Sequence, residues 1–440
     1  MPEMLDYDLA LDPALEPYRP EIEHACDFVE RGYFVRRRSG AHTKLYYGTR
    51  APADGIHVPA ALFPAGVRLD ADGIHLDRRE FAAIEQGRGP APLLPGPVGV
   101  EPGPGRLDYD ALGLIFFLLS RIEERGAPQS DHYGRFPAEA ALTLRQEQHH
   151  DPLADRAAFD LARLLTGESR PISRTRYEVA LTHDVDRLKA YHRPFEPLRL
   201  AAGDLLKRGR PMAAFRRFGA YISGEPWRSF RELMELSERY GLKSRFYFMG
   251  PSRLAQDSPY TLTMTETLKR VTDEVTRRGH AIGFHPGFAT AENANEWRRQ
   301  REGLETAIGA RVREGRQHVL RYRAERTPDI WEAEGMVTDY TLGFPGVSGF
   351  RSGTCRPFNA YSLRRRRTLT LEQCATAIMD FGLFGGKYRD LTVERALEEC
   401  RPAISACRRY GGRLVVLYHS GQSAGPVRRF YERLLQEAVS

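Results

Sequence analysis

The alternation of short apolar runs with longer polar segments, which begins near residue 175, constrains the fold of this chain most. The apolar runs that we expect to be strands are 177–182, 244–249, 280–284, 318–322, part of 338–350, 375–381 and 413–418. The expected helices are 227–240, 263–278, 293–308, 392–409 and 426–438. Alternation of this kind is typical of parallel βα units, and about seven units over ~265 residues predict an α/β fold, an irregular (β/α)7-type barrel.

The first 170 residues lack this alternation, and we expect them to form a mixed α/β N-terminal domain. The predicted domains are therefore 1–170 and 171–440, which agrees with a chain of 440 residues at ~150 residues per domain. Within the first domain we expect helices at 22–31 and 108–124 and short strands at 43–47 and 55–58. The segment 87–106 is rich in proline and glycine and is predicted to be an irregular loop.

The net charge of +7 raises the question of a nucleic-acid partner. All but six of the 65 basic residues are arginines, and they are spread along the chain, with one short run at 364–367. A nucleic-acid-binding surface usually gathers its basic residues on one face or in one segment. We therefore expect no nucleic-acid partner.

The cysteines and the N-terminus indicate a cytoplasmic protein. The five cysteines show no CxxC pair and no metal-type spacing, so we expect no disulfide framework and a reducing compartment. The N-terminal residues lack the basic and apolar regions of a secretory signal. The most apolar stretch, 112–120, is about half of the ~20 residues that a membrane span needs, so no span is predicted.

Acidic and histidine side chains follow several of the predicted strands. Asp184 and Asp186 end the first strand, in the sequence LTHDVD, and in an extended chain they point to the same side. Two such carboxylates suit a metal ligand and a general base, although a pair of turn or capping aspartates is the alternative. His285 ends the third strand before a Pro-Gly turn, His318 begins the next, and His419 ends the last. We expect these side chains to meet at one end of the barrel.

At these residues the chain resembles a known family. The segment from about 177 to 425 resembles the NodB-type polysaccharide deacetylases (carbohydrate esterase family 4-like), with its motifs at 182–186, 285–288, 316–321, 349–354 and 415–419. The N-terminal part, especially 116–124 and 130–136, resembles the accessory domain of a bacterial deacetylase-like subgroup. The resemblance implies a metal-dependent hydrolase that removes N-acetyl or O-acetyl groups from a carbohydrate or polysaccharide precursor.

The resemblance also implies a role for individual residues. Asp184 would be the catalytic base and His419 the general acid, while Asp186 and His285 would be metal ligands. The implied cofactor is a divalent metal ion, zinc in the first place, with cobalt, nickel and manganese as alternatives. The arginines of the motif region complete the set: Arg351 or Arg321 would orient the base or bind substrate, and Arg316, Arg321 and Arg351 would suit an anionic or a lipid- or nucleotide-linked sugar.

One departure from the family pattern concerns the metal site. The family has a second histidine four residues after the first, and here Ala289 occupies that position. Catalytic zinc sites normally have three protein ligands, so we hypothesise that His318 supplies the third. Two alternatives stay open: a catalytically inactive, carbohydrate-binding descendant, which Ala289 favours, and a hydrolase of another non-peptide C–N bond, because a fold does not fix the substrate.

Overall fold

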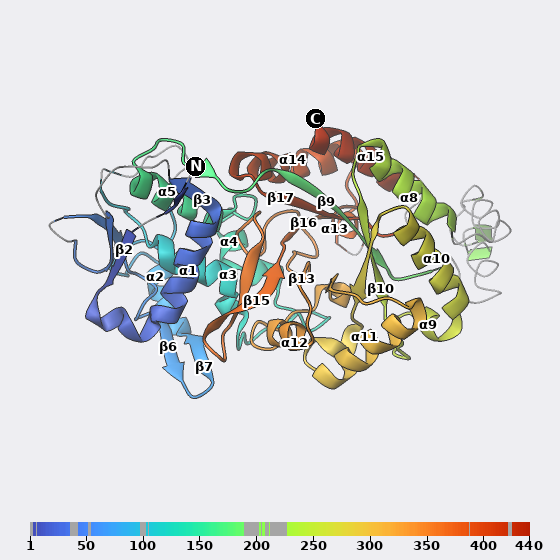
Figure 1. Ribbon diagram of the computed structural model, residues 1–440, viewed down its shortest axis with the longest axis horizontal. Helices are drawn as coiled ribbons and strands as arrows, with labels where there is room; N and C mark the ends of the chain where they lie inside the picture. The colour runs from blue at the N-terminus through green and yellow to red at the C-terminus, as the bar shows by residue number, and fades with distance from the viewer. Residues whose placement is uncertain are drawn as a thin grey trace.

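The structure is a computed structural model. It describes residues 3–5, 7–35, 43–51, 54–96, 103, 105–188, 202–203, 205–206, 211, 227–386, 388–420 and 425–440. Residues 97–102 and 104 of the expected proline-rich loop lie outside the described residues. Figure 1 shows the N-terminal elements, coloured blue to cyan, on one side of the molecule and a large sheet with its helices on the other.

The large sheet carries the part of the chain that alternates in sequence. In the described residues it has nine strands, and every pairing is parallel except that of β14 with β15. Its order is β14 (Phe358–Ser362), β15 (Arg367–Gln373), β13 (Thr338–Asp339), β12 (Glu314–Gly315), β11 (Ala281–His285), β10 (Ser244–Met249), β9 (Glu178–Val185), β17 (Arg413–Leu417) and β16 (Thr376–Met379).

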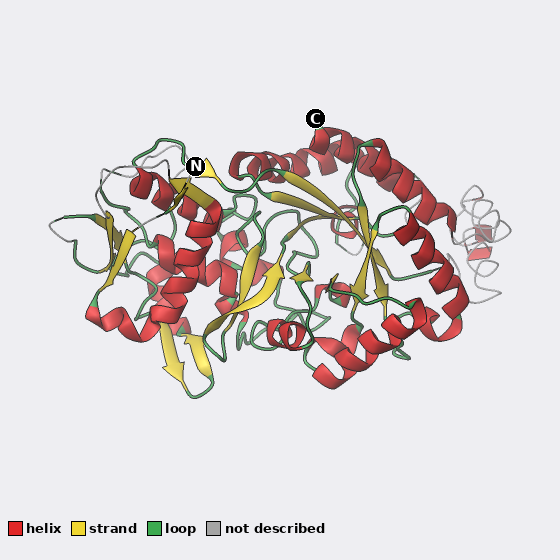
Figure 2. Ribbon diagram, viewed as in Figure 1, coloured by secondary structure: helices red, strands yellow, loops and turns green. Residues whose placement is uncertain are grey.

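Helices lie along the outer side of this sheet (Figure 1; Figure 2). They are α8 (Trp227–Arg239), α9 (Tyr260–Thr263), α10 (Thr265–Arg277), α11 (Ala294–Ile308), α12 (Thr327–Ala333), α13 (Asp380–Phe384), α14 (Val393–Tyr410) and α15 (Pro426–Val439). The longer ones are amphipathic: α10, for example, buries Leu268, Val271 and Val275 and exposes charged residues between them. The five helices expected from the sequence are confirmed, with ends that differ by a few residues.

The sheet differs from the expected barrel in two ways. It is curled, but its hydrogen-bonded order is open between β14 and β16, and near this gap the structure shows an isolated parallel bridge between Gly343 and Thr376. The antiparallel hairpin β14–β15 was not expected from the sequence, because its turn contains the basic run 364–367 and reads as a surface loop. The observed fold is therefore an α/β fold with a curled, half-barrel sheet.

The strand expected at 318–322 was wrong. The strand in this region is β12, only two residues long, and His318–Leu320 is a 3-10 turn (η5) that follows it. Gly315 explains why β12 lies where it does, since a Cβ at this position would come within 2.0 Å of the Phe284 carbonyl oxygen of β11. The correction moves His318 from the beginning of a strand to the carboxyl end of one.

The N-terminal part consists of small sheets around helices. Parallel strands form the order β2-β4-β5, antiparallel strands form β1-β3-β8, and β6 and β7 form a hairpin. Its elements are β1 (Glu3–Met4), β2 (Tyr7–Leu11), η1 (Pro13–Tyr18), α1 (Arg19–Gly32), β3 (Tyr33–Val35), β4 (Thr43–Gly48), β5 (Ile56–Pro59), β6 (Val67–Asp70), β7 (Gly73–Leu76), α2 (Arg78–Glu85), α3 (Ala111–Ser120), η2 (Ile122–Glu124), η3 (Ala138–Ala140), α4 (Leu142–Arg145), α5 (Leu153–Thr166) and β8 (Ile172–Ser173).

Helix α3 is the centre of the N-terminal part. All of its residues are buried, as its sequence ALGLIFFLLS requires, and it packs against α1 and α5. Asp110 caps the helix by accepting a hydrogen bond from Gly113 N at 2.8 Å, and its other oxygen accepts from the backbone of Ala61 and Leu62. This aspartate therefore fixes both the start of α3 and the loop beside it.

The two halves share apolar and charged contacts. The N-terminal core includes Phe358, Tyr361 and Leu363 from the β14–β15 hairpin. Glu124, at the end of η2, is buried between Arg121 of its own segment, at 2.9 Å, and Arg351, at 2.7 Å. Buried charges are costly unless they are paired and hydrogen-bonded, so this carboxylate ties Arg351 to the N-terminal part.

The cysteines and the basic run 364–367 have no part in the candidate functional site, which is described below. The five cysteines are buried free thiols. Within the described residues, no helix combines the length and the apolar character that crossing a membrane requires. The arginines of the basic run 364–367 form ion pairs of their own: Arg365 with Asp329, Arg366 with Glu21 and Arg367 with Glu332.

We predict that Glu124→Ala lowers the free energy of unfolding by about 3–5 kcal/mol, because it leaves Arg351 buried without its carboxylate and removes one of the two carboxylates that pair with Arg121, which keeps Glu123 at 2.6 Å. Urea denaturation measures the change. The control is Glu85→Ala, which breaks a partly exposed ion pair with Arg145 at 2.8 Å and should cost less than about 1 kcal/mol. Equal losses of unfolding free energy in the two variants would contradict the larger contribution that we assign to the buried ion pairs of Glu124.

Candidate functional site

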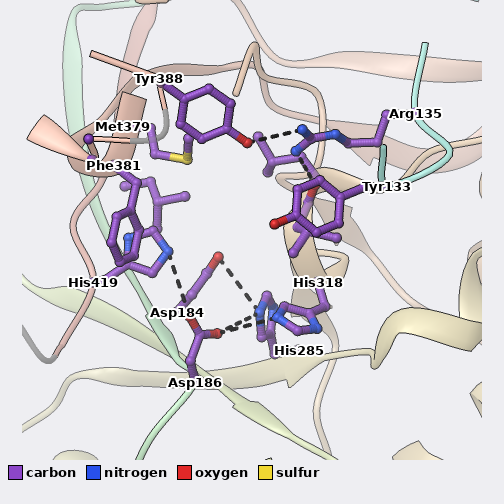
Figure 3. Close-up of a pocket in the computed structure, with 15 residues that line it drawn as sticks. Tyr133, Arg135, Asp184, Asp186, His285, His318, Met379, Phe381, Tyr388 and His419 are labelled. Carbon is purple, nitrogen blue, oxygen red and sulfur yellow. Dashed lines mark hydrogen bonds and ion pairs between the residues drawn. The ribbon is translucent and has the colours of Figure 1, made fainter. Parts of the chain in front are cut away.

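Five side chains meet at the carboxyl ends of the sheet strands (Figure 3). Asp184 is the next-to-last residue of β9, and Asp186 lies just beyond the end of this strand. Both side chains line the same pocket. His183, which directly precedes Asp184, faces the other way, where its ring nitrogens contact Tyr418 O at 2.7 Å and Ser244 Oγ at 3.0 Å. His285 is the last residue of β11, His318 follows β12, and His419 follows β17.

Asp186, His285 and His318 form a compact cluster in which one ligand atom of each lies within 4.8 Å of the others. The Asp186 Oδ1 atom is 3.3 Å from His285 Nε2 and 3.9 Å from His318 Nε2. The opposite ring nitrogens are held from behind, His285 Nδ1 by Arg316 O at 2.5 Å and His318 Nδ1 by Asp257 Oδ1 at 2.9 Å. Contacts of this kind orient metal-binding histidines, and here they direct both Nε2 atoms toward the carboxylate.

The cluster fits a divalent metal ion. Asp186 Oδ1 and His285 Nε2 are buried and have no hydrogen-bond partner, although buried polar atoms are normally satisfied. One carboxylate and two imidazoles form a ligand set typical of catalytic zinc sites, which leave a further position open. Ala289 lies on an exposed part of η4 (Phe288–Ala291). His318 lies beside Asp186 and His285, as the hypothesis of a third ligand requires.

The charges of the cluster change its pKa values. Burial by itself would raise the pKa of Asp186, but the adjacent His285 ring and the nearby charges of His419 and His318 lower it below its usual range. Burial would lower the pKa of His285, whereas the charges of Asp184 and Asp186 raise it above its usual value. Asp186 and His285 therefore stabilise each other's charged forms, and His285 must lose its proton when its Nε2 atom binds a cation.

Asp184 is fixed by Arg316, which is fully buried. The Arg316 guanidinium donates to Asp184 Oδ1 at 2.8 Å and to Thr182 Oγ1 at 2.8 Å. The other oxygen, Asp184 Oδ2, is 3.8 Å from His285 Nε2 and lines the pocket. One oxygen is thus engaged by an arginine, while the other is available beside the metal cluster.

His419 lies on the opposite side of the cluster and is held by Asp380 of α13. Its Nδ1 is 2.6 Å from Asp380 Oδ1, and its backbone N–H donates to Asp380 Oδ2 at 2.9 Å. Burial opposes protonation, but the charge and hydrogen bond of Asp380 raise the pKa of His419 to about 9. The Nε2 atom is 3.9 Å from Asp186 Oδ2 and faces the pocket. His419 is therefore placed as a proton donor at neutral pH.

The site opens into a pocket of about 400 Å³ whose walls come from both halves of the chain. Figure 3 shows Met379, Phe381 and His419 along one side and Tyr133, Arg135 and Tyr388 across from the aspartates. The remaining lining residues are Val319, Leu320, Leu417, Gly385 and Gly386. Apolar walls with a few convergent polar groups are typical of small-molecule sites.

Two of the arginines named from the sequence lie elsewhere. Arg351 is buried against Glu124 and does not line this pocket, and Arg321 stacks over Phe288 with its ring centroid 4.2 Å away. Arg316, which was expected to bind substrate, is the arginine beside Asp184. The motif spacing could not distinguish these roles, because it does not record the direction in which each side chain points.

Sequence reasoning missed four residues of the site. Asp380 and Asp257 lie behind the histidines, and Tyr133 and Arg135 belong to the N-terminal part. For Asp380 a signal was available, because it ends a predicted strand just as Asp184 does. For Tyr133 and Arg135 the only signal was the stretch 130–136, whose resemblance to an accessory domain carried no functional role.

The chain was compared with known proteins. Residues 32–169 match a family of unknown function, DUF7033. No curated protein sequence matches the chain. A candidate polysaccharide deacetylase from Mycobacterium smegmatis is similar at 18% sequence identity and a TM-score of 0.40, over 60% of this chain and 85% of that one.

Two further solved structures are similar at lower scores. A CE4 family pseudoenzyme from Bacillus anthracis has 11% sequence identity and a TM-score of 0.31, over 60% of each chain. A peptidoglycan N-acetylglucosamine deacetylase has 14% identity and a TM-score of 0.29, over 60% of this chain and 80% of that one. This chain therefore spans less than two thirds of the pseudoenzyme.

We predict that Asp380→Asn lowers the pKa of His419 from about 9 toward the ordinary value of 6.5, because the charge that stabilises the imidazolium is removed. An NMR titration of the His419 ring in metal-free protein measures this, with the signal assigned by a His419→Gln variant. In the wild type, the stability linked to this proton is fully present below pH 6.5 and is lost as the pH rises through about 9. An unchanged pKa in the variant would contradict the proposed cause.

Proposed function

We propose that this protein is a metal-dependent hydrolase that removes N-acetyl or O-acetyl groups from a carbohydrate. The observation that carries the proposal is the cluster of Asp186, His285 and His318, with Asp184 on one side and His419 on the other. The resemblance of segment 177–425 to the NodB-type polysaccharide deacetylases supports the same reading, since each of these residues lies in or beside one of the motifs.

Asp186, His285 and His318 would hold the divalent cation, with zinc as the first candidate and cobalt, nickel and manganese as alternatives. When bound, such a cation supplies Lewis acidity, which polarises a carbonyl and lowers the pKa of water to about 7. Both imidazoles offer Nε2 because Arg316 O and Asp257 engage their Nδ1 atoms. The pocket above them is where a substrate acyl group would lie.

Asp184 would be the general base. Hydrolysis of an amide requires that the attacking water lose a proton, and a carboxylate within hydrogen-bond reach of that water accepts it. Arg316 keeps Asp184 oriented by binding Oδ1, so that Oδ2 is left on the side of His285. We assign the orienting role to Arg316 and give Arg321 and Arg351, which do not line the pocket, no part in substrate contacts.

His419 would be the general acid. The departing amine must gain a proton before it leaves, and a protonated imidazole on the far side of the cluster can donate it. Asp380 holds the ring by Nδ1, which leaves Nε2 directed into the pocket. The proposed base thus lies beside His285 and the proposed acid beside Asp186, so that both can reach a substrate at the ligand cluster.

The surroundings suggest how the rest of the chain takes part. We propose that residues 1–170 form an accessory domain of the deacetylase domain 171–440. We also propose that the protein works in the cytoplasm, because its five cysteines are free thiols. A carbohydrate, including an anionic or a lipid- or nucleotide-linked one, is the proposed partner. The inactive, carbohydrate-binding alternative stays open, and the proposal that His318 is the third ligand argues against it.

Metal analysis and acetate release test this function. We expect the purified protein to bind one zinc ion and to release acetate from N-acetylglucosamine or its oligomers. Asp184→Asn should lower kcat by about 10²–10⁴-fold while metal binding is retained, because the proton acceptor is lost. Asp186→Asn should lose metal affinity, because it removes the carboxylate of the ligand cluster.

The control is Asp273→Asn, which alters an exposed aspartate of α10 that is paired with Lys269. It should leave both metal content and activity at the wild-type level. Wild-type activity in Asp184→Asn and Asp186→Asn would show that the assignment is wrong. Zinc and sugar binding without any acetate release would instead identify the inactive, carbohydrate-binding alternative.

A further inference from the structure

A short loop of the N-terminal part, residues 131–135, lies against the metal cluster region. The loop is closed on itself: Asp131 Oδ1 accepts hydrogen bonds from Tyr133 N at 2.8 Å and Arg135 N at 2.9 Å, and Asp131 N donates to Arg135 O at 2.9 Å. Tyr133 and Arg135 line the pocket (Figure 3). This 131–135 loop therefore reaches the site as a preformed unit.

The turn that carries His318 has a strained backbone. Val319 has φ 51° and ψ 25°, and Leu320 has φ 56°, so two consecutive residues other than glycine adopt the left-handed region. This conformation is unfavourable for L-residues and most of all for a β-branched one such as Val319. Strained conformations persist only where the surroundings hold them, and they gather at functional sites.

Arg135 supplies such a hold. Its Nη1 atom donates to the carbonyl oxygen of Val319 at 2.8 Å, inside the strained turn. The same guanidinium donates to Asp131 Oδ2 at 2.7 Å and to the Tyr388 hydroxyl at 3.0 Å, and the residue is buried. Charge-assisted hydrogen bonds to a fixed guanidinium are among the stronger ones. One side chain therefore joins the 131–135 loop, the His318 turn and the segment at Tyr388.

The ring and the backbone of His318 are held separately. Asp257 contacts Nδ1 and sets the rotation of the ring, whereas the contact of Arg135 with Val319 O acts on the main chain next to His318. If the turn relaxed to an ordinary conformation, the Cα–Cβ direction of His318 would change. The Nε2 atom would then leave its position 3.9 Å from Asp186 Oδ1.

We propose that Arg135 is a positioning residue of the metal centre: it holds the strained turn after His318 so that this histidine faces Asp186 and His285. The N-terminal part is then required for tight metal binding, although it contributes no ligand itself. This inference rests on the proposed metal centre and is independent of the reaction that the centre performs.

Zinc affinity of the full-length chain tests the inference, measured by competition with a chromophoric chelator. We expect Arg135→Ala and Arg135→Lys to bind zinc at least about 10-fold more weakly than the wild type, the size of effect found for residues that support metal ligands. Lysine keeps the charge but cannot reach Asp131, Val319 O and Tyr388 together. Tyr388→Phe, which removes one hydrogen-bond acceptor of Arg135, should weaken binding less and in the same direction.

The matched control is Arg156→Lys. Arg156 is also a buried arginine of the N-terminal part that joins an aspartate, Asp151 at 3.5 Å, to a backbone carbonyl, that of Gly96 at 2.6 Å, but it lies outside the pocket. Its variant should bind zinc as tightly as the wild type. A loss of affinity as large as that of Arg135→Lys would show a general effect of destabilisation and would overturn the inference.

A second substitution tests the strain itself. In the Arg135→Ala background we expect Val319→Gly to restore part of the zinc affinity, because glycine adopts a positive φ without a steric penalty. The comparison is Val337→Gly in the same background, at an exposed valine outside the turn, which should restore nothing. Equal effects of the two glycines would contradict the role of the turn.

The remaining outcomes are distinct. Circular dichroism establishes that each variant is folded, and if Arg135→Ala is not, Arg135→Lys and Tyr388→Phe decide the question. Unchanged zinc affinity in these folded variants overturns the inference alone. A wild-type protein that binds no zinc overturns the metal centre and with it both proposals. The last outcome is that the wild type and the variants bind zinc as predicted but the wild type releases no acetate from any acetylated sugar. That outcome overturns the proposed function and leaves the role of Arg135 unaffected.

Discussion

The buried guanidinium of Arg316 is the interaction on which the site and the curled sheet both depend. Its Nε donates to Tyr340 O beyond β13, and its Nη atoms donate to Asp184 and Thr182 of β9 and to Thr376 of β16. It thus joins strands on both sides of the open gap in the sheet. A fully buried cation must be paired and hydrogen-bonded to be tolerated. The contacts of Arg316 therefore hold these strand ends in one arrangement. The backbone carbonyl of Arg316 also orients the His285 ring.

The two halves of the chain form one functional unit through buried arginines. Arg351 of the second half is neutralised by Glu124 of the first, and Arg135 of the first half reaches the turn after His318 in the second. Arginine suits this task because its planar fork can bind several oxygen atoms at once. The arginine-rich composition, which in the sequence raised the question of nucleic acid, serves in part to connect segments that are distant along the chain.

The architecture of the second half could be predicted from the sequence where the pattern was long and periodic. Strands β9, β10, β11 and β17 and the long helices were found because apolar periodicity is a local property. The two-residue strand β12 and the hairpin β14–β15 were not found, because their place in the sheet is decided by neighbours, and β13 takes up only the first two residues of the stretch 338–350 in which a strand was expected. Gly315 shows this: its strand is defined by close approach to β11, which no local pattern records.

For the site, the sequence by itself determined the chemistry, namely that aspartates and histidines at strand ends would meet and that Ala289 left a gap in the usual ligand set. Only the tertiary structure decided which of these side chains lie together: His318 beside Asp186, Arg316 rather than Arg351 beside Asp184, and Asp380 behind His419. The physical reason is that residue type and strand position are local, whereas a distance of 3–4 Å between side chains depends on how strands curl and which buried charges need a partner. The sequence contains Asp, His and Arg in the right region, and the packing of the whole chain selects among them.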